Sequence, residues 1–421
     1  MNRPSFANKS KIVYITSLVL CVALLFLGML LATKGGTDFY ASADGALYLR
    51  AKVTEIRDTV NEYGDEGEIL SSDILFGAKV TSSGEYKGKE LTVYQNYSSY
   101  TLLNPRPAEV GDSIIIGQFE GVDGWNFIDF ARSDAIVVLA LLFALLLILF
   151  GGKKGVKTVL SLALTVLSVL FVFIPAVITG GNIYFWAVAV CVYIIVMTLM
   201  ITDGASPMSL SAIVGCTGGV LVSLLLTFIT DAFIHISGNS DPHSIFLIYI
   251  GEGLDLRALI YASIIIGSVG AVMDVAVDIS ASLKEIAIKL GRPTMKELFR
   301  SGINIGRDVI GTMSNTLVLA YMGGSMCSLL LYFYNNMAYP VYLVNIESII
   351  VEMLKILVGS IGILLTLPLT ALFSAWLYTR KGVLAKLSAE ISAGTDDTDE
   401  FSEMLEAAGT YNDGKDTQNE E

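Results

Sequence analysis

The stretch Gly267-Ser-Val-Gly-Ala-Val-Met-Asp-Val-Ala-Val-Asp-Ile-Ser280 lies at the end of a long apolar run and carries two carboxylates. On a helix with 3.6 residues per turn, Asp274 and Asp278 lie on one face, one turn apart. Small residues continue that face in both directions: Gly267, Gly270, Ala271 and Ser282. A neighbouring backbone can approach closely along such a stripe, and acids inside a membrane face protein or water. The stretch therefore predicts a membrane helix whose acidic side is turned away from lipid.

The composition of the 421 residues is typical of a membrane protein, with 53% hydrophobic and only 16% charged residues. The apolar residues gather in long runs, which a soluble protein could not bury. The formal net charge of -13 argues against a nucleic-acid partner. The cysteines all lie inside apolar runs, so the sequence offers no disulfide framework: Cys21, Cys191, Cys216 and Cys327.

Eight apolar runs approach or exceed the ~20 residues that a helix needs to cross a bilayer. They cover residues 12–32, 134–150, 157–179, 183–201, 209–229, 257–277, 309–334 and 349–378. The first run is longer than the apolar core of a signal peptide, roughly 7–15 residues, so we expect an uncleaved anchor. The predicted fold class is an all-α polytopic membrane protein with about eight transmembrane helices.

A polar segment with β character separates the first two runs. Apolar and polar residues alternate in five stretches, which predicts strands near 47–57, 69–81, 90–97, 110–116 and 125–130. Five strands in ~85 residues indicate a small barrel of OB or similar type. The segment lacks the basic and aromatic pattern of an oligonucleotide site, which favours a folded spacer or contact domain.

The distribution of lysine and arginine predicts the orientation. The connections 180–182, 230–256 and 335–348 contain neither residue, whereas 1–11, 151–157, 278–308 and 379–421 are rich in them. We therefore expect both termini in the cytoplasm and the β domain outside. The predicted parts are 1–34 with the first helix, 35–132 as the β domain, 133–379 as a seven-helix block, and 380–421 as an acidic, largely disordered tail.

Two short helices are expected in the inner connection 278–308. Leu283, Ile286, Ala287 and Leu290 form an apolar face beside lysines, which is typical of a helix on the membrane surface. The break Gly291-Arg-Pro293 ends it, and Thr294-x-x-Glu297 predicts a capping box that opens the second helix.

Polar residues gather at the inner ends of the predicted spans. The candidate coupling residues are Asp274, Asp278, Asn315, Thr316, Arg307 and Asp203, with Asn304 and Asp308 nearby. One interpretation is a cation, proton or substrate-coupling site, because buried carboxylates titrate and pair readily. The alternative is structural: Asp274 or Asp278 pairs with Arg307 and holds two helices together.

The remaining polar groups are more typical of structural roles than of a functional site. Asp231, His235, Asp241 and His243 in an outer loop are weak metal candidates, because their spacing matches no established zinc pattern. Glu352 and Lys355 either pair along one helix or extend to the interface. Close helix packing is expected at Gly215-x-x-x-Gly219, Gly323-Gly324 and Gly359-x-x-Gly362. We expect no metal and no cofactor.

Two motifs resemble the bacterial YibE/F family of multi-span membrane proteins. They are Gly267-x-x-Gly-Ala-x-Met-Asp-Val-Ala-x-Asp-Ile279 and Ile305-Gly-Arg-Asp-x-Ile-Gly-Thr-Met-x-Asn-Thr-Leu317, continued by Ala320-Tyr-x-Gly-Gly324. The anchor, the β domain and the multi-span block are similar to that family as well. The resemblance implies a bacterial cytoplasmic membrane and brings no settled reaction. Because Asp278 stands where variable residues are expected, the resemblance supports Asp274 more.

The leading hypothesis for function is a transporter or export-type permease with an inner-leaflet acidic site. The alternative is a non-enzymatic envelope scaffold or receptor whose β domain binds a peptide or an envelope partner. An intramembrane aspartyl protease is disfavoured, because its two acids lie on different helices and no Gly-x-Gly-Asp occurs here. We expect no enzyme activity. The expected partners are lipid, a solute, peptide or ion substrate, and a partner subunit or a second copy of the chain.

Overall fold

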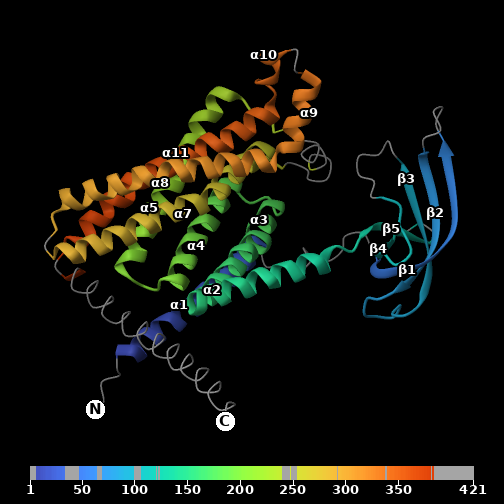
Figure 1. Cartoon of the computed structure of the whole chain (residues 1–421), viewed down its shortest axis with the longest axis horizontal. Coiled ribbons are helices and arrows are strands. Elements are labelled where there is room, and N and C mark those ends of the chain that lie inside the picture. Colours follow the sequence, from blue (N-terminus) through green and yellow to red (C-terminus); the bar gives the residue numbers. More distant parts are fainter. Residues whose placement is uncertain are drawn as a thin grey trace, which may run out of the picture. The chain divides into compact units, whose positions relative to one another are not determined.

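The computed structural model describes residues 6–33, 47–63, 69–98, 106–119, 121, 124–238, 247, 254–291, 293–336, 339–380 and 382–383. The chain divides into two units, one of Thr37–Gly155 and one of Met1–Gly36 with Val156–Glu421. The first unit contains the strands and the second contains most of the helices (Figure 1). The predicted acidic tail lies almost entirely outside the described residues.

Five strands close into a barrel, as the alternating pattern predicted. They are β1 (Leu47–Tyr63), β2 (Ile69–Val80), β3 (Glu90–Ser98), β4 (Ser113–Gln118) and β5 (Trp125–Phe130). Their order around the barrel is β1-β2-β3-β5-β4, with β3 and β5 parallel and the other neighbours antiparallel. Inward side chains such as Phe76, Val93 and Ile114 are fully buried and form the core.

β4 begins later than the sequence predicted. Val110, Gly111 and Asp112 form a turn instead of the start of the strand, because Gly111 has a φ of 98°. Gly111 donates its amide hydrogen to the carbonyl oxygen of Val53, so the turn is tied to β1. This positive φ favours glycine at this turn.

α2 (Ser133–Ser168) is interrupted at Gly152, whose φ of 52° and ψ of -130° are not helical. A Cβ on Gly155 would lie 2.0 Å from the carbonyl oxygen of Leu147. In a straight helix residues eight apart are separated by ~12 Å, so the chain folds back on itself at Gly152. The break falls between the runs predicted at 134–150 and 157–179. The helix continues through a π-helical turn, η2 (Val169–Phe173), into α3 (Ile174–Ile178).

The helical unit is built from α1 (Phe6–Ala32), α4 (Ile183–Thr202), α5 (Pro207–Ile234), α7 (Leu256–Leu290), α8 (Met295–Gly324) and α11 (Glu347–Tyr378). Helices α5, α7, α8 and α11 lie side by side (Figure 1). α9 (Met326–Asn336) follows α8 at a bend of 67°, and α10 (Pro340–Leu343) is a single turn.

The prediction of two short helices in the inner connection is wrong. The first is the end of α7, and the second is the start of the 30-residue helix α8. Leu283, Ala287 and Leu298 are fully buried in the helical core rather than lying on a membrane surface. The capping box itself is confirmed, since Thr294 and Glu297 exchange side-chain and backbone hydrogen bonds.

Small and hydroxyl residues let α5 and α11 approach closely. A Cβ on Gly215 would meet Thr370 and a Cβ on Gly219 would meet Thr366, each at 1.9 Å from the hydroxyl oxygen. Such stripes are a common way for membrane helices to pack, so the prediction for Gly215-x-x-x-Gly219 is confirmed. It is wrong for Gly323 and Gly324, because a Cβ added to either glycine would have no atom within 4 Å. These two residues precede the bend into α9.

Six helices among the described residues are long and apolar enough to cross a membrane, or seven if α8 and α9 form one bent span. The sequence predicted eight. One of the two missing spans is the bent pair α8 and α9, and the other lies in Ser133–Ile178, which counts as one stretch of 46 residues although Gly152 interrupts it.

Candidate functional site

The acidic stripe of α7 consists of Gly267, Gly270, Asp274 and Asp278. Both carboxylates are exposed, whereas Val272, Val275 and Ala276 on the opposite side are fully buried. No atom lies within 4 Å of a Cβ placed on Gly270. The expectation that this stripe packs against another helix of the chain therefore fails among the described residues at Gly270, Asp274 and Asp278.

α8 also presents an exposed polar face. Its members are Asn304, Arg307, Asp308, Gly311, Thr312, Asn315 and Thr316, which recur at helical spacing. The two threonine hydroxyls donate to backbone carbonyls of their own helix, Thr312 to Val309 and Thr316 to Thr312. The opposite side of α8 packs on α11, where Gly302 and Gly306 contact Ala371 and Leu367.

The two helices run in opposite directions, and two close approaches define their register. The hydroxyl of Tyr321 would lie 2.2 Å from a Cβ on Gly267. At the other end of the contact, a Cβ on Gly302 would lie 3.0 Å from Leu283. Between these approaches both helices are continuous, so residues between them can be matched level by level at ~1.5 Å per residue.

This register brings the charged residues to shared levels. Arg307 is level with Asp278, and Gly311 is level with Asp274. Even so, no ion pair or hydrogen bond joins Arg307 to either aspartate in the described part of the chain. The predicted structural pairing of Asp274 or Asp278 with Arg307 is therefore not formed within the chain.

The acidic stripe and the polar face lie on the same side of the helical unit. At ~100° per residue, Arg307 and Gly311 lie ~40° and ~80° around α8 from Tyr321, away from the side that packs on α11. Asp274 and Asp278 lie within ~20° of Gly267, the residue that Tyr321 covers. We call the combined surface the α7–α8 polar surface.

Asp274 of α7 lies inside the helical unit rather than at its end. The sulfur of Cys216 on α5 approaches the carbonyl oxygen of Val272 at 3.9 Å. Cys216 lies ~14 Å along α5 from its first residue, Pro207, and Asp274 is therefore ~10 Å from that end. Asp278, one turn further along α7, lies ~4 Å from the same end.

Asp203 does not join this surface. It ends α4, and its carboxylate accepts a hydrogen bond from the hydroxyl of Thr202 at 2.8 Å. Lys157 donates to the carbonyl oxygen of Thr202 at 3.2 Å. Across the described ranges no hydrogen bond or ion pair links Asp203 to α7 or α8, so this candidate serves as a helix end.

Of the outer candidates, Asp231 has structural partners. Asp231 accepts a hydrogen bond from the Tyr261 hydroxyl at 2.9 Å and lies 3.7 Å from Arg257. His235 is exposed and ends α5 in a left-handed conformation. Asp241 and His243 lie outside the described residues. Within the described ranges no group of three His, Cys, Asp or Glu side chains could hold a metal.

Glu352 and Lys355 of α11 pair with each other, which is one of the two alternatives that the sequence left open. Lys355 donates to Glu352 at 2.6 Å, and both side chains are largely buried. This i,i+3 pair neutralises both charges on one helix. Nearby, Glu347 accepts three hydrogen bonds from Ser237 and Gly238, which ties the end of α5 to the start of α11.

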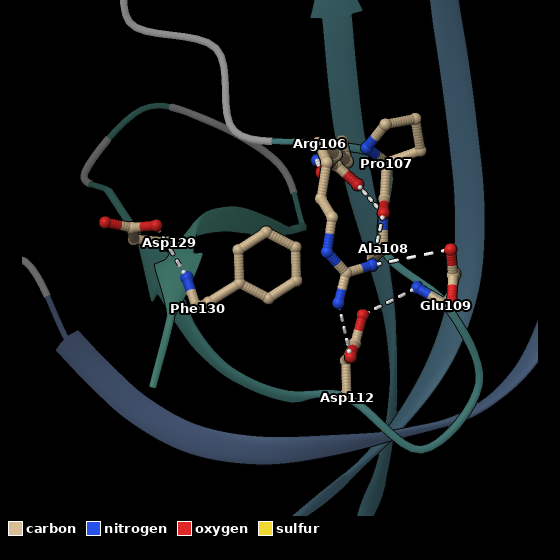
Figure 2. Close-up of polar contacts among 8 residues, drawn as sticks. Arg106, Pro107, Ala108, Glu109, Asp112, Asp129 and Phe130 are labelled. Atoms are coloured by element: carbon tan, nitrogen blue, oxygen red, sulfur yellow. Dashed lines mark hydrogen bonds and ion pairs between the residues drawn. The ribbon is translucent and has the colours of Figure 1, made fainter. Parts of the chain in front are cut away.

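The barrel has a polar network that sequence patterns did not reveal. Figure 2 shows the guanidinium of Arg106 beside the ring of Phe130, 4.7 Å from its centroid, and bonded to Asp112 at 2.9 Å. Burial raises the pKa of Asp112, but the Glu109 amide and Arg106 lower it further, so its pKa lies below the ordinary value. The side chain of Gln95 bonds the backbone of Arg106 and Ala108 and so holds this segment against β3.

A cavity of about 460 Å³ opens on the barrel next to this network. It is lined by Ile56, Thr59, Asn61, Ser72, Ile74, Tyr97, Pro107 and Ala108. The lining combines apolar side chains with neutral hydrogen-bonding groups and carries no charge. Its size falls within the range of small-molecule sites.

Comparison with known proteins agrees with the two motifs. The YibE/F-like protein family matches residues 139–380, which is more than half of the chain and includes α7, α8 and α11. No curated protein and no solved structure matched the chain. The chain therefore belongs to the YibE/F-like protein family.

Proposed function

We propose that this protein is a permease of the bacterial cytoplasmic membrane in which the α7–α8 polar surface lines the path of a cation or a proton-coupled solute. The observation that carries this proposal is the clustering of Asp274, Asp278, Arg307 and Asn315 on two adjacent apolar helices, all exposed. A charged side chain that faces lipid at the centre of a membrane costs ~3 kcal/mol. Several such groups on one surface therefore favour contact with water or protein.

The orientation that we infer has both termini in the cytoplasm and the barrel outside, because lysine and arginine are absent from the connections assigned to the outer side. The closed five-stranded barrel supports an OB-like identity. No catalytic constellation in the sequence supports an enzyme, and no ATP-binding motif occurs, so an ion gradient or a separate subunit would supply the energy.

Purified protein in lipid vesicles with an internal pH-sensitive dye tests the permease. A membrane potential is imposed and the internal pH is followed for the wild type, Asp274→Asn and Asp203→Asn. We expect the signal to be lost in Asp274→Asn and kept in Asp203→Asn, because only Asp274 belongs to the polar surface. A wild type without any signal contradicts proton movement along this surface, and an Asp274→Asn variant with a full signal contradicts the role of Asp274.

The barrel cavity supports a second candidate, a scaffold or receptor that binds an uncharged peptide or envelope component outside the cell. In this role the helices only anchor the barrel. Complementation of a strain that lacks the protein separates the two. If a chain without residues 47–130 fails while Asp274→Asn complements fully, the scaffold is favoured; the reverse result favours the permease.

A further inference from the structure

We propose that the α7–α8 polar surface is covered by the same surface of a second copy of this chain, so that the path runs between two protomers. That the path runs between protomers rests on the proposed function, whereas the formation of the dimer does not. Within the described part of one chain, this surface is open: neither Gly270 nor Gly311 has an atom within 4 Å of an added Cβ.

The surface carries both signs of charge without internal partners. Arg307 lies on α8, and Asp274 and Asp278 lie on α7; none of them has a partner in the described part of the chain. A two-fold interface brings residue i of one copy to residue j of the other, and residue j back to residue i. The α8 half of the surface carries Arg307 beside Asp308, and Arg307 is the cation that can pair with the acidic half of α7 in a second copy.

The levels of the charges fit this symmetry. A two-fold axis normal to the membrane keeps every residue at its own depth. Arg307 and Asp278 share one level in each chain, as the approaches of Tyr321 to Gly267 and of Gly302 to Leu283 define. In a dimer, Arg307 of each protomer therefore meets Asp278 of the other protomer at the same depth, which gives two such pairs.

The small residues of the surface allow the close contact that such a pairing needs. Gly270 on α7 and Gly311 on α8 are exposed glycines at the level of, or one turn from, Asp274. Glycines at such positions let membrane helices approach through their backbones. Asp274 and Asn315 would then lie between the two copies, where water and a cation can reach them.

Charge reversal in trans tests the pairing. Two differently tagged copies are expressed together and one tag is purified from detergent. We expect wild-type copies to co-purify, and copies that both carry Arg307→Asp, or both carry Asp278→Arg, to lose co-purification. One Arg307→Asp copy with one Asp278→Arg copy should restore it, because each opposite pair is then re-formed between chains.

The outcomes separate this pairing from its alternatives. If only the double variant Arg307→Asp/Asp278→Arg restores co-purification, the pair is within one chain and the proposal is overturned. Wild-type copies that do not co-purify also overturn it, and leave the surface to a different membrane protein or to water. Neither readout depends on transport, so failure here is distinct from failure of the permease.

Cysteine cross-linking keeps the test decisive if charge reversal prevents folding. In a Cys327→Ser background the other three cysteines are buried. Gly270→Cys or Gly311→Cys, treated in membranes with a short bis-maleimide, should give a covalent dimer. Leu225→Cys on the exposed side of α5 is the matched control. Dimer yields no higher for the two glycine positions than for Leu225→Cys would overturn the proposal.

Discussion

The hydroxyl of Tyr321 on α8 lies directly over Gly267 of α7, so that any side chain at residue 267 would collide with it at 2.2 Å. That hydroxyl is buried and has no hydrogen-bond partner among the described residues. The Tyr321 hydroxyl therefore lies at one end of the α7–α8 polar surface as a buried polar group that no described residue satisfies with a hydrogen bond.

Replacement of Tyr321 by Phe tests what this hydroxyl does. If it has no partner, Tyr321→Phe should raise the free energy of unfolding by about 1 kcal/mol, because an unsatisfied buried hydroxyl is costly. Tyr378→Phe is the control, since its hydroxyl donates to the Ser280 carbonyl at 3.1 Å and its loss should destabilise. Thermal unfolding in detergent measures both. A destabilised Tyr321→Phe would show that water or a second copy satisfies the hydroxyl.

The α5–α11 contact predicts different tolerance at two glycines of one helix. Gly215→Ala should destabilise the protein by about 1–3 kcal/mol, because its Cβ would meet Thr370 at both hydroxyl and backbone. Gly218→Ala should cost much less, because its Cβ would meet mainly the end of the flexible Leu369 side chain. Unfolding midpoints of the two variants decide this, and equal losses would contradict the close contact.

The adjacent glycines Gly151 and Gly152 should differ in how well they tolerate a side chain. Gly152 has a φ of 52° and a ψ of -130°, a conformation that disfavours any side chain, whereas Gly151 is helical. Gly152→Ala should therefore cost about 1 kcal/mol or more, and Gly151→Ala should be neutral or slightly stabilising. Unfolding in detergent, followed by circular dichroism, tests the difference. The turn is not required if both variants unfold like the wild type.

The barrel should lose stability at low pH through Asp112. Its pKa in the folded state lies below the ordinary value of 3.8, because the Glu109 amide and Arg106 outweigh the effect of burial. The stabilisation is therefore complete above about pH 4 and declines as the pH falls through the folded pKa. Asp112→Asn should remove this part of the acid dependence.

Trp125 can report that transition, because it is the only tryptophan of residues 37–155. In a full chain with Trp186→Phe and Trp376→Phe, its fluorescence follows acid unfolding of the barrel. Glu85→Gln is the control, since its side chain is 82% exposed and lies as far as 3.9 Å from Lys89. A wild-type and an Asp112→Asn barrel with the same acid profile would contradict the assignment.

Much of the architecture followed from local patterns. The apolar runs identified the helices of the helical unit, and period-two alternation identified the five strands, because both signals depend only on neighbours along the chain. The capping box at Thr294 and a close helix contact at Gly215 and Gly219 followed in the same way, but only the structure identified α11 as the partner. The family membership followed from two motifs, each carried by a single helix.

Other features depended on contacts that no local pattern contains. Leu283 and Ala287 suit a surface helix as well as a buried one, and only packing against α8 and α11 made them the end of α7. Asp203 shares a side of the membrane with Asp274 in the sequence-based topology, yet in the structure it ends α4 and its carboxylate bonds the hydroxyl of Thr202.

The sequence by itself determined that Asp274 and Asp278 share one side of an apolar helix, because helical periodicity alone decides that. Only the tertiary structure decided what faces them. Helices α5, α8 and α11 cover the opposite and flanking sides of α7, since its apolar residues lie there, and so leave the carboxylates on an open surface level with Arg307.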